Sequence, residues 1–144
     1  MSTIERFEDS RTWMEARKLV NEIYSFTGQG KSSKDYGYKD QVRRSSLSVM
    51  NNIAEGFESQ TNKTFFSYLS KAKASCGETR SLLYIALDQS YIEKDKFEEL
   101  KRHCELLSIS LYRWMNYLNK EENRNKVREL GLPYNADPYT ELDF

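Results

Sequence analysis

Apolar residues recur along most of the chain at alternating steps of three and four, the spacing that places side chains on one face of an α-helix. The most regular row consists of Phe65, Leu69, Ala72, Cys76, Thr79, Leu83 and Ala86. Another consists of Phe97, Leu100, Cys104, Leu107, Leu111, Trp114 and Leu118. Shorter rows run through residues 13–24 and 42–57. The pattern predicts four amphipathic helices over about residues 10–26, 38–57, 61–88 and 94–118.

The two shorter rows are wider than a single line. In the first helix, the line consists of Trp13, Ala16, Val20 and Ile23, and Leu19 and Tyr24 broaden it. In the second helix, one line consists of Val42, Val49 and Ile53, and the other of Leu47, Met50, Ala54 and Phe57. We expect both lines of the second helix to be buried.

Turn-forming residues separate the four rows. Asp9 or Ser10 can cap the first helix and Thr61 the third, because their side-chain oxygens accept bonds from free backbone N–H groups. The second helix ends near Gly56, and Tyr91 and Ile92 lie in a turn where they can pack over the end of the helices. Four apolar stripes joined by short connections predict an all-α, up-down-up-down four-helix bundle.

The segment from Gly28 to Gly37 is rich in glycine, serine and lysine, and Gly30-Lys31-Ser32 resembles the end of a phosphate-binding loop. That motif requires a glycine at position 25, where the chain has Ser25, and it follows a strand rather than a helix. The segment is therefore interpreted as a flexible connection between helices.

A stripe of polar side chains accompanies the apolar lines of the second helix. It consists of Gln41, Arg44, Ser48, Asn52 and Glu55, spaced three or four residues apart. Such a stripe is either a solvent-exposed helix face or a surface packed against another helix or subunit. In the second case its charges need partners, because an unpaired buried charge costs several kcal/mol. Glu78 on the third helix is the expected partner of Arg44.

Composition restricts the function classes. The 144 residues suit one domain, and equal numbers of basic and acidic residues, 22 each, give no general argument for binding nucleic acid or an anionic membrane. The charged N-terminal segment does not resemble a signal peptide, and no apolar run is long enough to span a membrane. We expect a cytoplasmic protein in which Cys76 and Cys104 are buried reduced thiols.

Residues that could carry catalysis are sparse in the sequence. The chain has one histidine, His103, which lies beside the apolar row of the fourth helix as a surface or boundary residue. No Glu-x-x-His pair, the usual metal-binding spacing within helical bundles, occurs in the sequence. We therefore expect no catalytic residue, metal or cofactor.

The chain changes character at Glu121. Residues 121–128 are mostly charged, and from Asp137 onward the chain has three acidic residues and no basic one. Pro138, Tyr139, Leu142 and Phe144 are apolar points in this acidic stretch. The expected division is a bundle over residues 1–120 and a C-terminal tail over 121–144. The tail is either disordered or docked on the bundle or a neighbouring subunit.

The stretch from Gln41 to Gly56, with Gln-Val-Arg-Arg, Ser48 and Asn-Ile-Ala-Glu-Gly, resembles the signature of a known family. The similarity continues in Thr64 to Leu69, in Ala72 to Glu78 and in Gln89 to Ile92. The family is that of the four-helix proteins encoded in intervening sequences of bacterial 23S ribosomal RNA, the S23 family. The chain departs from it in lacking Phe-Pro in the first loop and a proline at Met50.

The resemblance implies a four-helix bundle without enzymatic activity that assembles into a ring-shaped homo-oligomer, commonly a pentamer. The more distantly similar accessory protein of diversity-generating retroelements is a basic pentamer that binds nucleic acid and a reverse transcriptase. This chain lacks net positive charge.

These observations support three functional hypotheses. The first is a non-enzymatic oligomeric scaffold or adaptor, associated with ribosomal RNA or a nucleic-acid enzyme. Its interhelical or intersubunit polar network would comprise Gln41, Arg43, Arg44, Ser48, Asn52, Glu55 and Glu78. The alternative is a nucleic-acid-binding accessory module whose basic residues repeat around the ring, namely Lys31, Lys34, Lys39 and Arg43. The third is an enzyme using a Glu55–Glu78 carboxylate pair, which Arg44 would neutralise.

Overall fold

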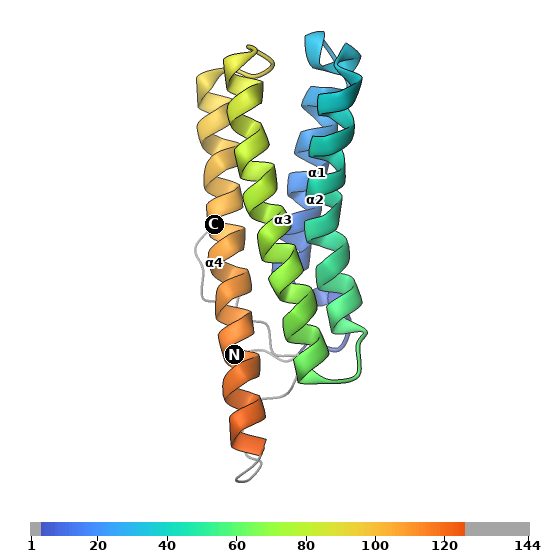
Figure 1. The fold of residues 1–144 in the computed structure, drawn as a ribbon, viewed down its shortest axis with the longest axis vertical. Coiled ribbons are helices and arrows are strands. Elements are labelled where there is room, and N and C mark those ends of the chain that lie inside the picture. Colours follow the sequence, from blue (N-terminus) through green and yellow to red (C-terminus); the bar gives the residue numbers. More distant parts are fainter. Residues whose placement is uncertain (1–3, 126–144) are drawn as a thin grey trace.

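The structure, a computed structural model, describes residues 4–125, the last four through their backbone only. Four antiparallel helices form an elongated bundle (Figure 1): α1 (Arg11–Thr27), α2 (Tyr36–Phe57), α3 (Asn62–Asp88) and α4 (Lys94–Asn125). Two short 3-10 helices, η1 (Phe7–Asp9) and η2 (Lys31–Lys34), precede α1 and α2. The predicted all-α four-helix architecture is confirmed.

Side-chain caps fix the starts of the first three helices. The hydroxyl of Ser10 accepts from the backbone N–H of Trp13 at 3.2 Å, and that of Thr61 accepts from Thr64 at 3.1 Å. Each such cap contributes about 1 kcal/mol. Both predicted caps are therefore confirmed. The second helix begins two residues earlier than predicted, because the carboxylate of Asp35 caps it.

The core contains the apolar rows predicted from the sequence. The two long rows, on α3 and α4, are buried throughout, and Phe65 packs edge-to-face on Trp114 with ring centroids 5.2 Å apart. Tyr24, expected to broaden the apolar face of α1, is instead 38% exposed. The second line of α2 is only half-buried, because it lies at the edge of the helix rather than under it.

The connection between α1 and α2 is more regular than expected. Ser32 is buried, and its hydroxyl donates to the carbonyls of Phe26 at 2.5 Å and Gln29 at 3.1 Å. These bonds satisfy one carbonyl in the last turn of α1 and one just beyond it, and they hold η2 against the helix. The predicted flexible connection is therefore wrong for this part of the segment.

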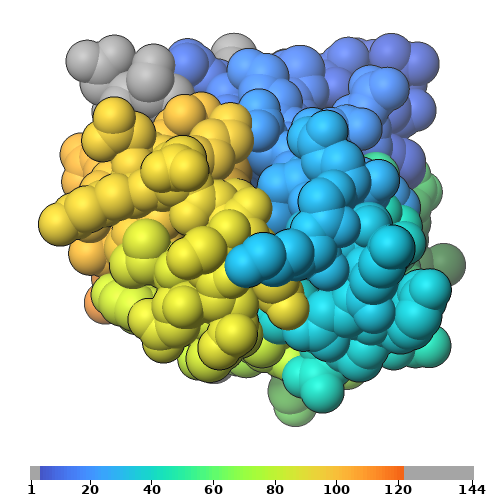
Figure 2. Space-filling model, turned by 90° about the horizontal axis from the view of Figure 1, so that it is seen from above, coloured from blue at the N-terminus to red at the C-terminus, as the bar shows by residue number. Residues whose placement is uncertain are grey.

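The α1–α2 and α3–α4 connections lie side by side at one end of the bundle, as Figure 2 shows in cyan and yellow. Tyr91 packs on Tyr38 with ring centroids 5.5 Å apart, and its hydroxyl donates to Asp35 at 2.6 Å. Ile92 is buried beside them. The expectation that Tyr91 and Ile92 cover the bundle end is confirmed.

Helix α4 is described as far as Asn125, past the expected division at residue 120. No glycine or proline interrupts this stretch, and Glu121 is buried. The rest of the predicted tail, residues 126–144, lies outside the described residues.

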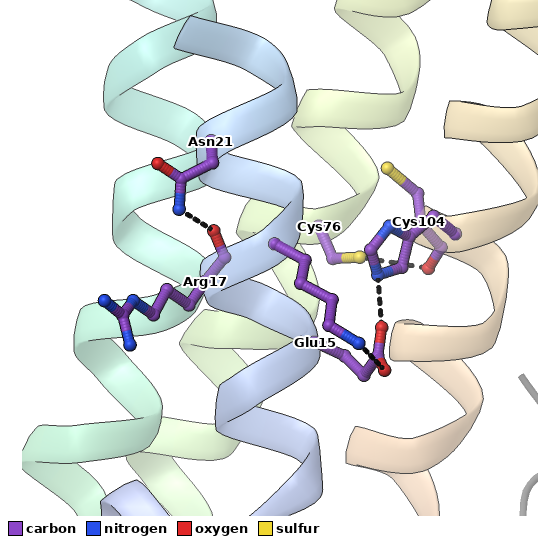
Figure 3. Close-up of polar contacts among 7 residues, drawn as sticks. Glu15, Arg17, Asn21, Cys76 and Cys104 are labelled. Carbon is purple, nitrogen blue, oxygen red and sulfur yellow. Dashed lines mark hydrogen bonds and ion pairs between the residues drawn. The ribbon is translucent and has the colours of Figure 1, made fainter. Parts of the chain in front are cut away.

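The two cysteines are buried free thiols, as predicted. The Cys76 thiol donates to the backbone carbonyl of Cys104 at 3.1 Å (Figure 3), which joins α3 to α4 in the core. Hydrogen bonding with Cys76 and burial raise the pKa of the Cys104 thiol. Cys104 is therefore a protonated packing residue at neutral pH.

Candidate functional site

A ladder of small polar side chains joins α2 to α3. The hydroxyls of Ser45 and Thr79 lie 2.8 Å apart, and those of Ser48 and Ser75 lie 2.7 Å apart. Asn52 extends the ladder by donating to the Ser48 hydroxyl at 2.9 Å. Short hydroxyl side chains allow two helices to approach closely while each polar group keeps a partner. Ser48, one of the predicted network residues, therefore links α2 to α3, and Asn52, another, holds the Ser48 hydroxyl from within α2.

Gly56 lies at the end of this ladder, where α2 and α3 approach closely. A Cβ atom at this position would lie 2.8 Å from both Phe65 Cδ1 and Tyr68 Cβ. That distance is well inside van der Waals contact, so only glycine fits without moving α3. The prediction that α2 ends near Gly56 is confirmed, since the helix ends at Phe57, and the structure adds that helix packing requires a glycine at this position.

The other charged residues of the predicted network form an exposed outer layer above the ladder. Arg44 pairs within α2, with its Nε 2.8 Å from Asp40 Oδ2, and both side chains are largely exposed. Gln41, Glu55 and Glu78 are exposed and make no hydrogen bond or ion pair within residues 4–125. The predicted pair between Arg44 and Glu78 is therefore not formed within one chain.

Arg43 lies apart from this layer, on the side of α2 that faces α1. Its Nε donates to the Thr27 hydroxyl at 2.8 Å, and its guanidinium carbon lies 4.1 Å from the ring centroid of Tyr24. A cation beside the C-terminal turn of a helix is also favoured by the helix dipole. Arg43 thus holds α2 to the end of α1, which explains the exposed position of Tyr24.

The proposed basic cluster at the end of the bundle is small. Lys31 and Lys34 are exposed on η2, Lys39 is half-buried on α2, and Arg43 is engaged with α1. The carboxylate of Asp35 lies at the same end. The structure therefore leaves Lys31 and Lys34 as the accessible cations of the predicted set.

A polar seam that sequence reasoning missed joins α1 to α4. The carboxylate of Glu15, a buried residue, lies 3.1 Å from His103 Nε2 and 3.0 Å from Lys18 Nζ (Figure 3). Burial lowers the pKa of His103 below its ordinary value, and the Glu15 carboxylate opposes this effect. The signal in the sequence was the position of Glu15, four residues before Leu19 on the apolar side of α1. Packing of this kind orients the histidine and keeps it neutral near pH 7.

The polar side chains between the helices mostly bond to one another. The ladder hydroxyls and the seam residues are bonded across helices, and no group of three or more His, Cys, Asp or Glu within residues 4–125 is arranged to hold a metal ion. Among the helices that the structure describes, none is long and apolar enough to cross a membrane. The fold and this surface define a class of small four-helix bundles with a polar α2–α3 face.

Comparison with known families identifies the particular family. The model of the 23S rRNA-intervening sequence protein family matches residues 8–113, and the chain belongs to this family. The match covers α1, α2, α3 and most of α4, including the ladder and Gly56. No curated protein matches the chain.

Proposed function

We propose that the chain is the subunit of a non-enzymatic homo-oligomer that serves as a scaffold or adaptor, with a ring as its assembly. The observation that carries this proposal is the exposed outer layer of α2 and α3. Arg44 and Glu78 have opposite charges and lie on neighbouring helices, yet they do not pair within the chain. Glu78 has no partner within residues 4–125, and Arg44 is held only by its exposed pair with Asp40, so both side chains can face a second copy.

The outer row of α3 suits close contact with another helix. It consists of exposed residues with short side chains, namely Ser67, Ser70, Ala74 and Ser81, with Glu78 among them. If the exposed face of α2 that carries Gln41, Arg44 and Glu55 packs against the outer row of α3 in the next copy, the contact joins two different surfaces. Such a head-to-tail contact closes into a ring when the rotation between copies allows it.

An ion pair contributes more when it is enclosed in an interface than when it lies exposed on the surface. An exposed pair such as Arg44–Asp40 is worth at most about 1 kcal/mol. The same charge facing Glu78 of another copy, with water excluded, adds both orientation and discrimination against wrong partners. We infer that Arg44 of one copy pairs with Glu78 of the next.

Charge reversal tests this interface. Arg44→Glu and Glu78→Lys should each lower the molar mass measured by light scattering at a fixed micromolar concentration. The double variant should restore it, because the pair is re-formed with exchanged signs. Glu98→Lys and Arg102→Glu, exposed residues of α4, serve as matched controls and should leave the mass unchanged. An unchanged mass in both single variants would remove Arg44 and Glu78 from the interface.

Association with nucleic acid is a second candidate function, and the family description places the proteins in the context of 23S ribosomal RNA. Its support in this chain is the exposure of Lys31 and Lys34 at one end of the bundle, where a ring would repeat them in every subunit. Binding of a short RNA should weaken steeply with salt, because phosphate contacts release counterions. The double variant Lys31→Glu/Lys34→Glu should bind the RNA more weakly than the wild type does. An affinity that does not change between low and moderate salt would exclude this interface.

A further inference from the structure

Three surface hollows follow one line between α3 and α4. The first, of about 140 Å³, is lined by Asn62, Lys63, Phe66, Leu118 and Asn119. The second, of about 180 Å³, is lined by Lys73, Ser108, Ile109 and Tyr112. The third, of about 100 Å³, shares Lys73 and Ser108 with the second and adds Cys76, Gly77, Arg80 and Cys104. We call this line of hollows the α3–α4 groove.

The lining of the α3–α4 groove combines positive charge with apolar surface. It contains three cations, Lys63, Lys73 and Arg80, and no carboxylate. Ile109 and Tyr112 are 43% and 55% exposed, and a ligand lying in the groove would cover both side chains. A groove of this kind suits an acidic peptide with interspersed apolar side chains.

We propose that the α3–α4 groove binds the segment Asp137–Phe144 of the same chain. The segment carries three acidic residues, Asp137, Glu141 and Asp143, and no basic one. Its apolar side chains are Pro138, Tyr139, Leu142 and Phe144. Its charges complement the three cations of the groove, and its apolar residues complement the surface around Ile109 and Tyr112.

The lengths of the groove and the segment agree. Residues 63–80 of α3 extend ~26 Å at ~1.5 Å per residue. Residues 137–144 cover about the same ~26 Å when extended at ~3.3 Å per residue. The intervening residues 126–136 can span up to ~36 Å, whereas Leu118 lies only ~10 Å along the helix axis from the end of α4. The segment can therefore reach the groove of its own chain.

Proteolysis of the full-length chain tests the docking. Chymotrypsin cleaves after Tyr139 and Leu142, and docking should slow that cleavage. Lys73→Glu/Arg80→Glu should accelerate it at least several-fold, and adding Glu141→Lys/Asp143→Lys should restore the slow rate by exchanging the charges. Lys71→Glu/Arg102→Glu changes two exposed cations of α3 and α4 outside the groove and should cleave as the wild type does.

Mass spectrometry of the products separates the outcomes. Equal cleavage rates in the wild type and Lys73→Glu/Arg80→Glu would overturn the proposal. Protection that appears only at high protein concentration would also overturn it, because the segment would then occupy a neighbouring copy. Circular dichroism of each variant verifies that the bundle is folded. Binding within one chain does not depend on the ring, so a monomeric protein would leave this test unaffected.

Discussion

Gly56→Ala adds one methyl group at the closest approach of α2 and α3. The new Cβ would lie 2.8 Å from Phe65 Cδ1 and Tyr68 Cβ. Phe65 has little room to move, because it is fully buried and packs on Trp114 at 5.2 Å and on Phe57 at 6.1 Å between ring centroids. The helices would therefore have to separate locally, which also stretches the neighbouring hydroxyl ladder.

Two opposing contributions set the size of the effect. Alanine favours the helical backbone over glycine by up to about 1 kcal/mol. Forcing extra volume into a packed contact costs about 1–3 kcal/mol. With the full helical gain subtracted, we therefore expect Gly56→Ala to lower the free energy of unfolding by up to about 2 kcal/mol. Gly77→Ala is the matched control, because a Cβ on Gly77 has no neighbour within 4 Å. This control should raise the free energy of unfolding by about 0.5–1 kcal/mol.

Urea unfolding followed by far-ultraviolet circular dichroism measures both variants beside the wild type. The protein concentration must be the same in all samples, since assembly would otherwise shift the midpoints. If Gly56→Ala is as stable as Gly77→Ala, the steric explanation of this glycine is refuted.

Three further predictions concern titratable and reactive groups. Burial lowers the pKa of His103 in the folded protein, so the contribution of His103 to stability is present above pH ~6.5 and is lost as pH falls. NMR titration should show the lowered pKa of His103. Glu15→Gln should lower that pKa further, because the carboxylate of Glu15 raises it. Burial raises the pKa of Tyr38, so the contribution of Tyr38 to stability is present below pH ~10 and is lost above it as the unfolded chain ionises. In thermal melts, Tyr38→Phe should abolish the part of the stability loss at alkaline pH that is due to Tyr38. Cys76 and Cys104 are buried, so a thiol reagent should modify them slowly in the folded protein and rapidly in denaturant, and fast modification of the folded chain would contradict their burial.

The sequence was sufficient to predict the fold because apolar periodicity reports directly on which helix face is buried. The row from Phe65 to Ala86 matches the buried residues of α3 one for one. The caps at Ser10 and Thr61 were equally readable, since their hydroxyls act within one turn of the same helix. The division at residue 120 was drawn where the chain becomes polar, and α4 is described past it, as far as Asn125.

The candidate site was predicted less completely, because its contacts join residues far apart in the chain. Spacing placed Ser48 and Asn52 on one stripe, but not opposite Ser75. It also could not show that Arg43 turns towards Tyr24, because two sides of a helix are equally available to a long side chain. The close approach at Gly56 depends on the distance between two helices, which periodicity does not specify.

We propose above that this bundle assembles through the outer layer of α2 and α3. The most direct test is the molar mass of the wild-type protein by size-exclusion chromatography with light scattering at micromolar concentration, recorded with its ultraviolet absorbance ratio to detect nucleic acid. We expect a mass several times the 17.0 kDa of one chain, with five copies implied by the family resemblance. A mass of one chain at that concentration would contradict it.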